Sequence, residues 1–327
     1  MTTDSKRILI ATFPFGTTGN KPLELLHKTG WELVFNPHHR RLTAQDVSDL
    51  LPGIDAVIAG TEPYNAETLA TADRLKVISR VGIGLDSVDL GYCSESDIAV
   101  TYTPDAPSDG VAELTVANIL NLLRHIHASD RSVREGAWNR LMGHLVRDVA
   151  IGVVGVGRIG SRVIRLLEPF GARILATDTD PTVHGQPLPN TEWCDLESIL
   201  SKADLISFHI PMNEENHHFV NRDRIAAMKT GAMIINTARG GIADTEALTD
   251  ALLQRHLGGA ALDVYEKEPY VGPLSQLDNV ILTAHIAASA KGSRYLMELG
   301  AAEDCIRVLS GASPANNALY EVLSQRH

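Results

Sequence analysis

Three polar residues in the second half of the chain each follow an apolar run typical of a buried strand. Arg239 comes after AMIINTA, Glu268 after GGAALDVY, and His285 closes VILTAH. The planar guanidinium of an arginine suits a carboxylate, a histidine can give a proton near neutral pH, and a neighbouring glutamate can stabilise and orient the imidazolium. Together they fit hydride transfer to a 2-oxo acid, which needs a cation, a hydrogen-bond donor and an acid. Taken singly, each also fits a structural or surface residue.

The stretch GVVGVGRIG, residues 152–160, predicts the cofactor that this chemistry needs. It follows the apolar run VRDVAIGVV and precedes a helical pattern and a second apolar run that ends in Asp178. In such a turn Gly155 permits the tight bend, Gly157 lets the backbone approach a pyrophosphate, and Gly160 lets helix and strand pack closely. Asp178 can accept hydrogen bonds from the ribose hydroxyls of NAD and would repel a 2′-phosphate. We therefore expect NAD as the cofactor.

Strand and helix patterns alternate along most of the chain, first over residues 6–104 and again from about 146 to His285. This order predicts an α/β fold of two doubly wound, parallel-sheet (Rossmann-like) domains with an inter-domain cleft. Between the two arrays, residues 109–137 predict one uninterrupted helix, which would cross between domains or form a subunit interface. The predicted domains are a substrate (catalytic) domain, 1–105 plus 290–327, and an NAD-binding domain, 106–289.

Composition disfavours several classes of protein. The 327 residues carry a net charge of −11, so a nucleic-acid or anionic-membrane surface is not expected. The apolar part of the N-terminal segment is too short for a signal peptide or a membrane span, and we expect a cytoplasmic protein. The cysteines have no close spacing and predict neither disulfides nor a zinc site: Cys93, Cys194 and Cys305.

Two smaller features are open to interpretation. The stretch SRVGIGLDSVD places Gly82 and Gly84 just after a strand, where their N–H groups could bind an anion or the glycines could serve the turn alone. The pairs His38-His39 and His217-His218 lie in polar segments with no partner at ligand spacing. We expect both pairs to be solvated, and we expect no metal site.

Stretches between about residues 55 and 290 resemble the D-isomer-specific 2-hydroxyacid dehydrogenases, and within them the D-3-phosphoglycerate dehydrogenases most closely. The matching stretches are SRVGIGLDSVD, TPDAPSDGVAELT, GVVGVGRIG, INTARGGIADTEAL, GGAALDVYEKEP and VILTAHIAAS. The resemblance implies that Arg239, Glu268 and His285 are the catalytic residues. With the glycine turn, it also implies cofactor contacts at Thr103, Gly155, Gly157, Arg158, Ile159, Gly160, Asp178, Ile210, Thr237, Ala238, Arg239, Asp263, His285 and Ala288.

The resemblance further implies two similar α/β domains, a C-terminal helix that closes the substrate domain, and a homodimer built on the cofactor domain. The match departs from the family at Ala284, where proline is usual, and at Arg147, where glycine is common; neither change removes a reactive group. About forty residues follow His285, which leaves no room for the regulatory domains of some phosphoglycerate dehydrogenases, so we expect no feedback control by serine through such a domain.

The implied reaction is hydride transfer between NAD(H) and a D-2-hydroxy acid/2-keto acid pair, with 3-phosphoglycerate or another anionic 2-hydroxy acid as candidates. Arg80 and Arg140 match positions that place cations for a substrate phosphate in phosphoglycerate dehydrogenases. Alternatively, Arg80 supports the glycine turn and Arg140 is a surface charge. The expected substrate contacts are Arg80, Val81, Gly82, Arg140, Arg239 and His285.

Other members of the superfamily suggest different functions. A non-catalytic, NAD-sensing corepressor of the same fold would depend on extended tails, which this chain hardly has beyond its folded core. Formate dehydrogenases do not use the glutamate partner, and Glu268 is present. Phosphite dehydrogenases carry a lysine in the glycine turn where this chain has Ile83. An enzyme acting on a small 2-hydroxy acid is therefore the favoured interpretation.

Overall fold

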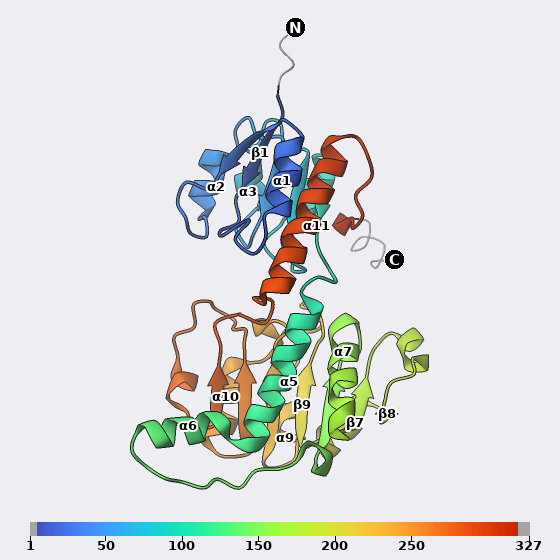
Figure 1. Ribbon diagram of the computed structural model, residues 1–327. Coiled ribbons are helices and arrows are strands. Elements are labelled where there is room, and N and C mark those ends of the chain that lie inside the picture. Colours follow the sequence, from blue (N-terminus) through green and yellow to red (C-terminus); the bar gives the residue numbers. More distant parts are fainter. Residues whose placement is uncertain (1–4, 320–327) are drawn as a thin grey trace. The chain divides into compact units, whose positions relative to one another are not determined.

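The chain folds into two compact α/β units, as seen in a computed structural model that describes residues 5–319 (Figure 1). One unit combines the chain up to Pro107 with the chain from Ala288 onwards, and the other is Ser108–Ala287. Every paired strand in both units is parallel. The prediction of two parallel-sheet α/β domains is confirmed. Within residues 5–319, no helix combines the length and the apolar character needed to cross a bilayer.

The first unit is built on a sheet of five strands in the order β2-β1-β3-β4-β5. Successive residues of β1 point to opposite faces, and both faces are buried: Ile8 and Ile10 pack with one core cluster and Leu9 with another. The strands are β1 (Arg7–Ile10), β2 (Glu32–Phe35), β3 (Ala56–Ala59), β4 (Val77–Arg80) and β5 (Ala99–Thr101). The helices are α1 (Lys21–Lys28), α2 (Ala44–Leu50), α3 (Ala66–Leu69), α4 (Leu90–Glu95) and α11 (Lys291–Leu309).

The second unit is built on a sheet of seven strands in the order β12-β11-β10-β9-β6-β7-β8. The strands are β6 (Ala150–Val154), β7 (Arg173–Thr177), β8 (Thr191–Trp193), β9 (Leu205–Phe208), β10 (Ala232–Asn236), β11 (Leu257–Leu262) and β12 (Val280–Leu282). The helices are α5 (Ser108–Arg124), α6 (Ile126–Arg134), α7 (Arg158–Leu167), α8 (Leu196–Lys202), α9 (Arg222–Ala226) and α10 (Thr245–Leu253). In Figure 1, α5 and α7 lie side by side over one face of this sheet. Because the chain runs outwards from β6 in both directions, ligands are expected outside the carboxyl ends of β6 and β9.

The single helix predicted over 109–137 is wrong, because the structure breaks it into α5 and α6 at His125. His125 adopts a left-handed conformation, with φ 52°, which a right-handed helix cannot include. The side chain of Asn121 compensates, since its Oδ1 accepts a hydrogen bond from the His127 N–H at 2.9 Å. The segment after α6, from residue 135 to 145, contains no helix or strand.

Candidate active site

The carboxyl ends of the second unit's strands carry most of the predicted site residues. Parallel strands end at the same edge of a sheet, so the segments that follow them are neighbours. The glycine turn follows β6, Asp178 follows β7, Ile210 follows β9, and Arg239 follows β10. Asp263 directly follows β11, and His285 lies three residues after the end of β12. The topology therefore gathers residues that lie more than a hundred positions apart in the sequence.

His285 and Glu268 form a hydrogen-bonded pair. The Nδ1 atom of His285 lies 2.9 Å from Oε2 of Glu268. The other carboxylate oxygen, Oε1, accepts a hydrogen bond from the N–H of Tyr265 at 3.2 Å, which fixes the orientation of the glutamate. The two side chains remain accessible, at 46% exposure for His285 and 35% for Glu268. With Nδ1 bound to the carboxylate, Nε2 is the ring nitrogen that remains for another partner.

Asp263 holds the loop that carries His285. This carboxylate is fully buried, at 0% exposure. Its Oδ1 accepts hydrogen bonds from the Thr283 hydroxyl at 2.5 Å and the Ile286 N–H at 2.8 Å, and its Oδ2 accepts one from the Ala287 N–H at 2.8 Å. These bonds enclose His285, whose φ of 53° lies in the left-handed region. The family resemblance implied that Asp263 is a cofactor contact; its role in bracing this loop was not predicted, since it depends on a pairing across twenty residues.

Arg239 lies in a loop that packs directly against the segment leading to Glu268. A Cβ atom on Gly240 would lie 1.9 Å from the carbonyl carbon of Tyr265, so only glycine permits this approach. The buried amide of Asn236 also fixes the loop, by donating to the carbonyl of Arg239 at 2.8 Å and accepting from the N–H of Ala238 at 3.0 Å. The guanidinium of Arg239 is half-buried and donates to the carbonyl of Ala238 at 2.7 Å.

The glycine turn has the backbone geometry that a dinucleotide needs. Gly155 has φ 87°, a left-handed value, and a Cβ atom there would lie 2.7 Å from the carbonyl oxygen of His209. A Cβ atom on Gly160 would lie 2.0 Å from the carbonyl oxygen of Gly155. By contrast, the space where a Cβ of Gly157 would lie is open to at least 4 Å. The turn therefore packs tightly on the protein side and leaves room for a ligand beside Gly157, at the start of α7.

Asp178 is hydrogen-bonded to the glycine turn itself. Its Oδ2 accepts from the N–H of Val156 at 2.6 Å, and its Oδ1 accepts from the N–H of Asp180 at 2.9 Å. The residue is half-buried. A carboxylate has about four lone-pair positions, so each oxygen of Asp178 retains acceptor capacity for a ribose hydroxyl.

The remaining cofactor candidates of the second unit lie on the same sheet edge or beside it. Arg158 and Ile159 open α7, and Thr237 and Ala238 precede Arg239. The hydroxyl of Thr237 is 3.0 Å from that of Thr115 on α5, so this side chain also ties the loop to a helix. Ala238, Ile159 and Ile210 are half-buried and pack against the core.

The candidates of the first unit make their contacts within that unit. Thr103 and Gly82 are joined reciprocally: the N–H of Gly82 donates to the Thr103 hydroxyl at 2.9 Å, and the N–H of Thr103 donates to the Gly82 carbonyl at 3.0 Å. The N–H of Val81 donates to Ala59. Ala288 packs against a core cluster of that unit. The N–H groups of Val81 and Gly82 are thus satisfied internally.

The two arginines expected at a substrate phosphate have different environments. Arg80 is 5% exposed and its guanidinium donates to the backbone carbonyls of Gly84, at 2.9 Å, and Gly60. It therefore braces the glycine turn after β4. Arg140 is exposed in the irregular segment that follows α6, in the other unit.

The expectation that His217-His218 has no partner at ligand spacing is wrong. The Nε2 atom of His218 lies 2.6 Å from Oε1 of Glu266, and the His217 ring stacks on that of His218 with centroids 3.9 Å apart. Burial acts to raise the pKa of Glu266, but hydrogen bonds from Thr245 and His218 outweigh it and lower that pKa. His38 and His39 are exposed, as expected, but Nε2 of His38 lies 3.4 Å from Oδ1 of Asp46. No local signal in the sequence relates His218 to a glutamate 48 residues later.

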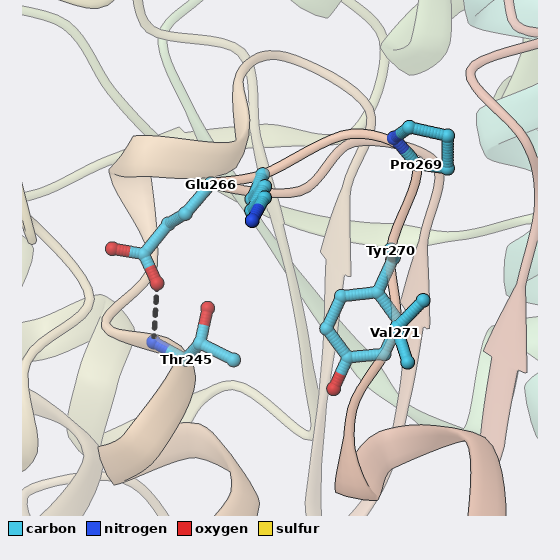
Figure 2. A pocket seen from close by; sticks show the side chains of 6 residues that line it. Thr245, Glu266, Pro269, Tyr270 and Val271 are labelled. Atoms are coloured by element: carbon cyan, nitrogen blue, oxygen red, sulfur yellow. Dashed lines mark hydrogen bonds between the residues drawn. The ribbon is translucent and has the colours of Figure 1, made fainter.

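A small pocket lies next to this glutamate. Figure 2 shows Glu266 reaching back to the N–H of Thr245, at the start of α10, with Pro269, Tyr270 and Val271 on the other side. Tyr270 stacks on Tyr265, with ring centroids 4.8 Å apart. Burial, together with the charge of Asp263, raises the pKa of Tyr265 to about 12, so this hydroxyl stays protonated and donates to the carbonyls of Leu262 and Thr283.

Comparison with known proteins identifies relatives of this chain. Residues 116–287 match the family model of the D-isomer specific 2-hydroxyacid dehydrogenase, NAD binding domain. The chain is 39% identical to a glyoxylate reductase of Thermofilum pendens, over 81% of each chain. It is 35% identical to a hydroxypyruvate reductase of Thermotoga maritima, over 83% of this chain and 90% of that one. The crystal structure of the TT0316 protein from Thermus thermophilus matches with a TM-score of 0.85 and 34% identity, covering 96% of this chain and 99% of that one.

Phosphoglycerate dehydrogenases are also among the relatives. The chain is 34% identical to that of Archaeoglobus fulgidus, over 82% of this chain but 52% of the relative. The identity is higher to the glyoxylate reductase, so these matches give no preference to the phosphoglycerate dehydrogenases. The reductases and the phosphoglycerate dehydrogenase among these relatives bear enzyme names, and the alternative of a non-catalytic NAD-sensing protein gains no support from them. The chain therefore belongs to the family of NAD-dependent, D-isomer-specific 2-hydroxyacid dehydrogenases.

Proposed function

We propose that this protein reduces a small, unphosphorylated 2-oxo acid, with glyoxylate and hydroxypyruvate as the leading substrates, to the corresponding 2-hydroxy acid. The observation that carries the proposal is the His285–Glu268 pair, held 2.9 Å apart on the same sheet edge as the glycine turn. An acid with a fixed carboxylate partner beside a dinucleotide site is the arrangement that carbonyl reduction needs. The relatives named for these two substrates support the choice.

The residues of the second unit divide the chemistry between them. Arg239 binds the substrate carboxylate through its planar guanidinium. His285 polarises the carbonyl through Nε2 and donates its proton to the developing alkoxide, because its Nδ1 is bound to Glu268. Glu268 stabilises the imidazolium before that transfer and keeps the ring in one orientation. The contributions of Arg80, Val81, Gly82 and Arg140 stay predictions.

The glycine turn fits NAD(H). Open space beside Gly157 admits a pyrophosphate, the N-terminus of α7 faces it with backbone N–H groups, and Asp178 retains acceptor capacity for the ribose hydroxyls. Bound there, NADH supplies the hydride. Thr237, Ala238 and Asp263 lie at the edge where the nicotinamide would be, with Arg158, Ile159 and Ile210 nearer the phosphates. Thr103 and Ala288, from the other unit, stay predicted contacts.

A phosphorylated substrate is disfavoured by the state of Arg80. The residue is 5% exposed and its guanidinium is bound to backbone carbonyls, so recruiting it to a phosphate would break buried hydrogen bonds. Each such bond contributes about 1.5–3 kcal/mol when one partner is charged. A small carboxylate needs only Arg239, whose loop packs through Gly240 against the segment that leads to Glu268.

The test is NADH oxidation by the purified protein with a panel of 2-oxo acids. The panel contains glyoxylate, hydroxypyruvate, pyruvate, 3-phosphohydroxypyruvate and a branched-chain 2-oxo acid, each also assayed with NADPH. We expect the highest kcat/KM for glyoxylate or hydroxypyruvate with NADH, and a D configuration for the product of hydroxypyruvate. A preference for 3-phosphohydroxypyruvate would overturn the substrate assignment, and absence of oxidation with the whole panel would overturn the activity.

We also propose that the protein is a homodimer formed through the second unit. Large apolar side chains are exposed along α6 and the segment after it: Ile126 (53%), Val133 (51%), Trp138 (77%), Leu141 (47%), Met142 (90%) and Leu145 (46%). Several large exposed apolar side chains within one twenty-residue segment favour a protein interface there. Sedimentation of the wild type and of Trp138→Ser with Met142→Ser tests this: the wild type should sediment as a dimer and the double variant as a monomer. A monomeric wild type would refute the proposal.

A further inference from the structure

The loop between β11 and the cis Pro269 carries two glutamates, and each is bound to a histidine. Glu268 pairs with His285, and Glu266 pairs with His218 at 2.6 Å. The first pair belongs to the proposed reaction. The second pair has no part in it, although its glutamate lies two residues from the first. A third group, the ring of His217, stacks on His218 with an interplanar angle of 23°.

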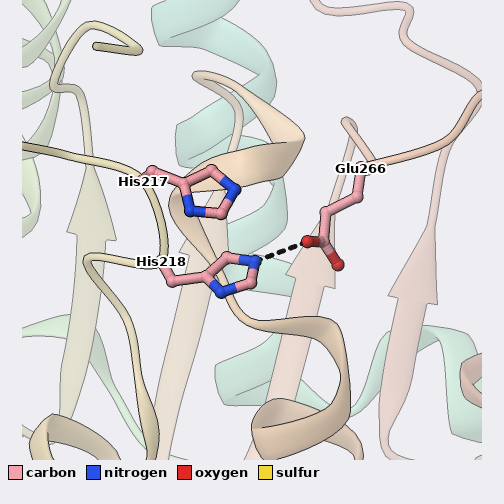
Figure 3. Close-up of side chains that lie close together, drawn as sticks. All are labelled: His217, His218 and Glu266. Carbon is pink, nitrogen blue, oxygen red and sulfur yellow. Dashed lines mark hydrogen bonds and ion pairs between the residues drawn. The ribbon is translucent and has the colours of Figure 1, made fainter. Parts of the chain in front are cut away.

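We propose that His217, His218 and Glu266 form a binding site for a divalent transition-metal ion, with Zn²⁺ as the reference ion. Each residue offers one ligand atom, and the three atoms all lie within 4.8 Å of one another. Figure 3 shows both imidazoles projecting from their loop towards the carboxylate of Glu266. Two imidazole nitrogens and a carboxylate oxygen are a donor set that suits Zn²⁺ and similar ions, and the exposed position leaves a fourth place for water.

The backbone on the histidine side of the cluster is held in place, so closing the site moves the side chains and the loop that carries Glu266. The N–H of His218 donates to the carbonyl of Gly241 at 2.8 Å, which anchors the histidine loop beside β10. Glu266 accepts a hydrogen bond from the N–H of Thr245 through Oε2, which leaves Oε1 for the metal. The His217 ring is exposed and can rotate at little cost from its stacked position to bring a nitrogen towards the same point.

The ion would take the place of the hydrogen between His218 and Glu266. For Zn–N and Zn–O bonds of about 2.0–2.1 Å in tetrahedral geometry, the nitrogen and oxygen ligands lie about 3.3 Å apart. The present separation of 2.6 Å would therefore widen by roughly 0.7 Å. Because Glu266 and Glu268 share one short loop, this movement reaches the partner of His285. We expect the metal to inhibit turnover, a consequence that rests on the proposed function.

Binding is tested with Zn²⁺ alone, by competition against a chromogenic chelator, on the wild type and on His217→Ala and Glu266→Gln. We expect one Zn²⁺ per chain in the wild type and at least about tenfold weaker binding in each variant, as losses around metal sites typically give. His38→Ala is the matched control, because His38 belongs to the other exposed histidine pair and is not part of the cluster. Circular dichroism checks that the variants are folded.

The outcomes separate binding from catalysis. Wild-type binding no tighter than that of His217→Ala and Glu266→Gln, or equal loss in His38→Ala, would overturn the site. If Zn²⁺ binds as expected and inhibits the wild type at least about tenfold more strongly than His217→Ala, both the site and its coupling are supported. Tight binding without inhibition would overturn the coupling and support the site. Because zinc binding is measured without substrate, it tests the site even if the 2-oxo-acid assay shows no turnover.

Discussion

Replacing Asp263 with asparagine tests whether a buried carboxylate holds His285, the proposed proton donor, in place. In the structure Oδ1 accepts from Thr283 and Ile286, and Oδ2 accepts from Ala287. Asparagine keeps one acceptor oxygen but puts an NH₂ group where the other oxygen was. With the oxygen facing the two donors of Thr283 and Ile286, the NH₂ group faces the N–H of Ala287. Two donors then oppose each other in a fully buried position.

The magnitude follows from these contacts. An N–H left without an acceptor in a buried position costs about 1–3 kcal/mol, and the two remaining bonds lose their charge assistance, at about 1 kcal/mol each. The sum, roughly 3–5 kcal/mol, is an upper limit on the loss of unfolding free energy, because the loop can relax. Relaxation is favoured at His285, whose left-handed conformation costs about 1–2 kcal/mol. The imidazole would then leave the position that Glu268 and the substrate require.

Urea unfolding and steady-state kinetics measure the two effects separately. We expect Asp263→Asn to lose about 2–4 kcal/mol of unfolding free energy. We also expect it to lower kcat for the best 2-oxo acid at least about tenfold, since destabilising the productive loop conformation by about 1.4 kcal/mol lowers the rate by a factor of ten. KM should change less, because Arg239 is not held by Asp263. NADH binding, followed by fluorescence, reports whether the cofactor site survives.

Asp304 provides the matched control. It is also a buried carboxylate, at 3% exposure, and its oxygens accept from the N–H groups of Ala315 at 2.7 Å and Asn316 at 3.3 Å, in the other unit. Asp304→Asn should lose stability without lowering kcat under conditions where the protein is folded. If both variants lower kcat equally, the effect is general destabilisation. An Asp263→Asn variant with unchanged stability and kcat would refute the reasoning altogether.

Four further substitutions test the remaining assignments. Arg239→Ala should lower kcat/KM by at least about a hundredfold, since a buried charge-assisted contact costs about 3 kcal/mol, with NADH binding nearly intact in a fluorescence titration; loss of both would contradict the substrate role. Glu268→Gln should lower kcat at least about tenfold with little change in KM, and unchanged kinetics would remove Glu268 from the reaction. Asp178→Ala should raise the NADPH-to-NADH ratio of kcat/KM, and a constant ratio would contradict the ribose assignment. Burial lowers the pKa of His209 to about 4, below its unfolded value of about 6.5, so between these pH values the unfolded state binds one more proton and the free energy of unfolding falls as the pH drops. In urea unfolding at several pH values, His209→Gln should reduce the slope of unfolding free energy against pH by up to about 1.4 kcal/mol per pH unit. An unchanged slope would show that another group causes it.

The alternation of strands and helices made the sheet edge predictable. Once a run of apolar residues is identified as a parallel strand, the polar residue after it must lie at the carboxyl edge, whatever its distance along the chain. Arg239 and His285 could be placed there from their neighbours alone. Glu268 lies six residues after the end of β11, so its place beside His285 depends on the course of its loop, and the structure brings the two side chains to 2.9 Å.

Features that depend on the angles of one residue or on contacts between distant loops were not predictable. The pattern of apolar residues continues through His125, and it does not reveal that a single left-handed residue splits the helix. Similarly, the pattern contains nothing that connects His218 with Glu266, because the contact arises from the order of β9, β10 and β11 in the sheet. The use of Arg80 within its own turn is of the same kind, since carbonyl acceptors have no sequence signature.

The candidate site combines exposed side chains with buried polar anchors. His285 and Glu268 are 46% and 35% exposed, whereas Asp263 and Asn236, which hold their loops, are 0% and 1% exposed. Buried hydrogen bonds are strong and specific because water cannot compete for them, so the anchors determine where the exposed groups can be. Substitution of an anchor should therefore reduce stability and turnover together, whereas substitution of Glu268 should reduce turnover alone. That contrast follows from burial, and it distinguishes residues that react from residues that position them.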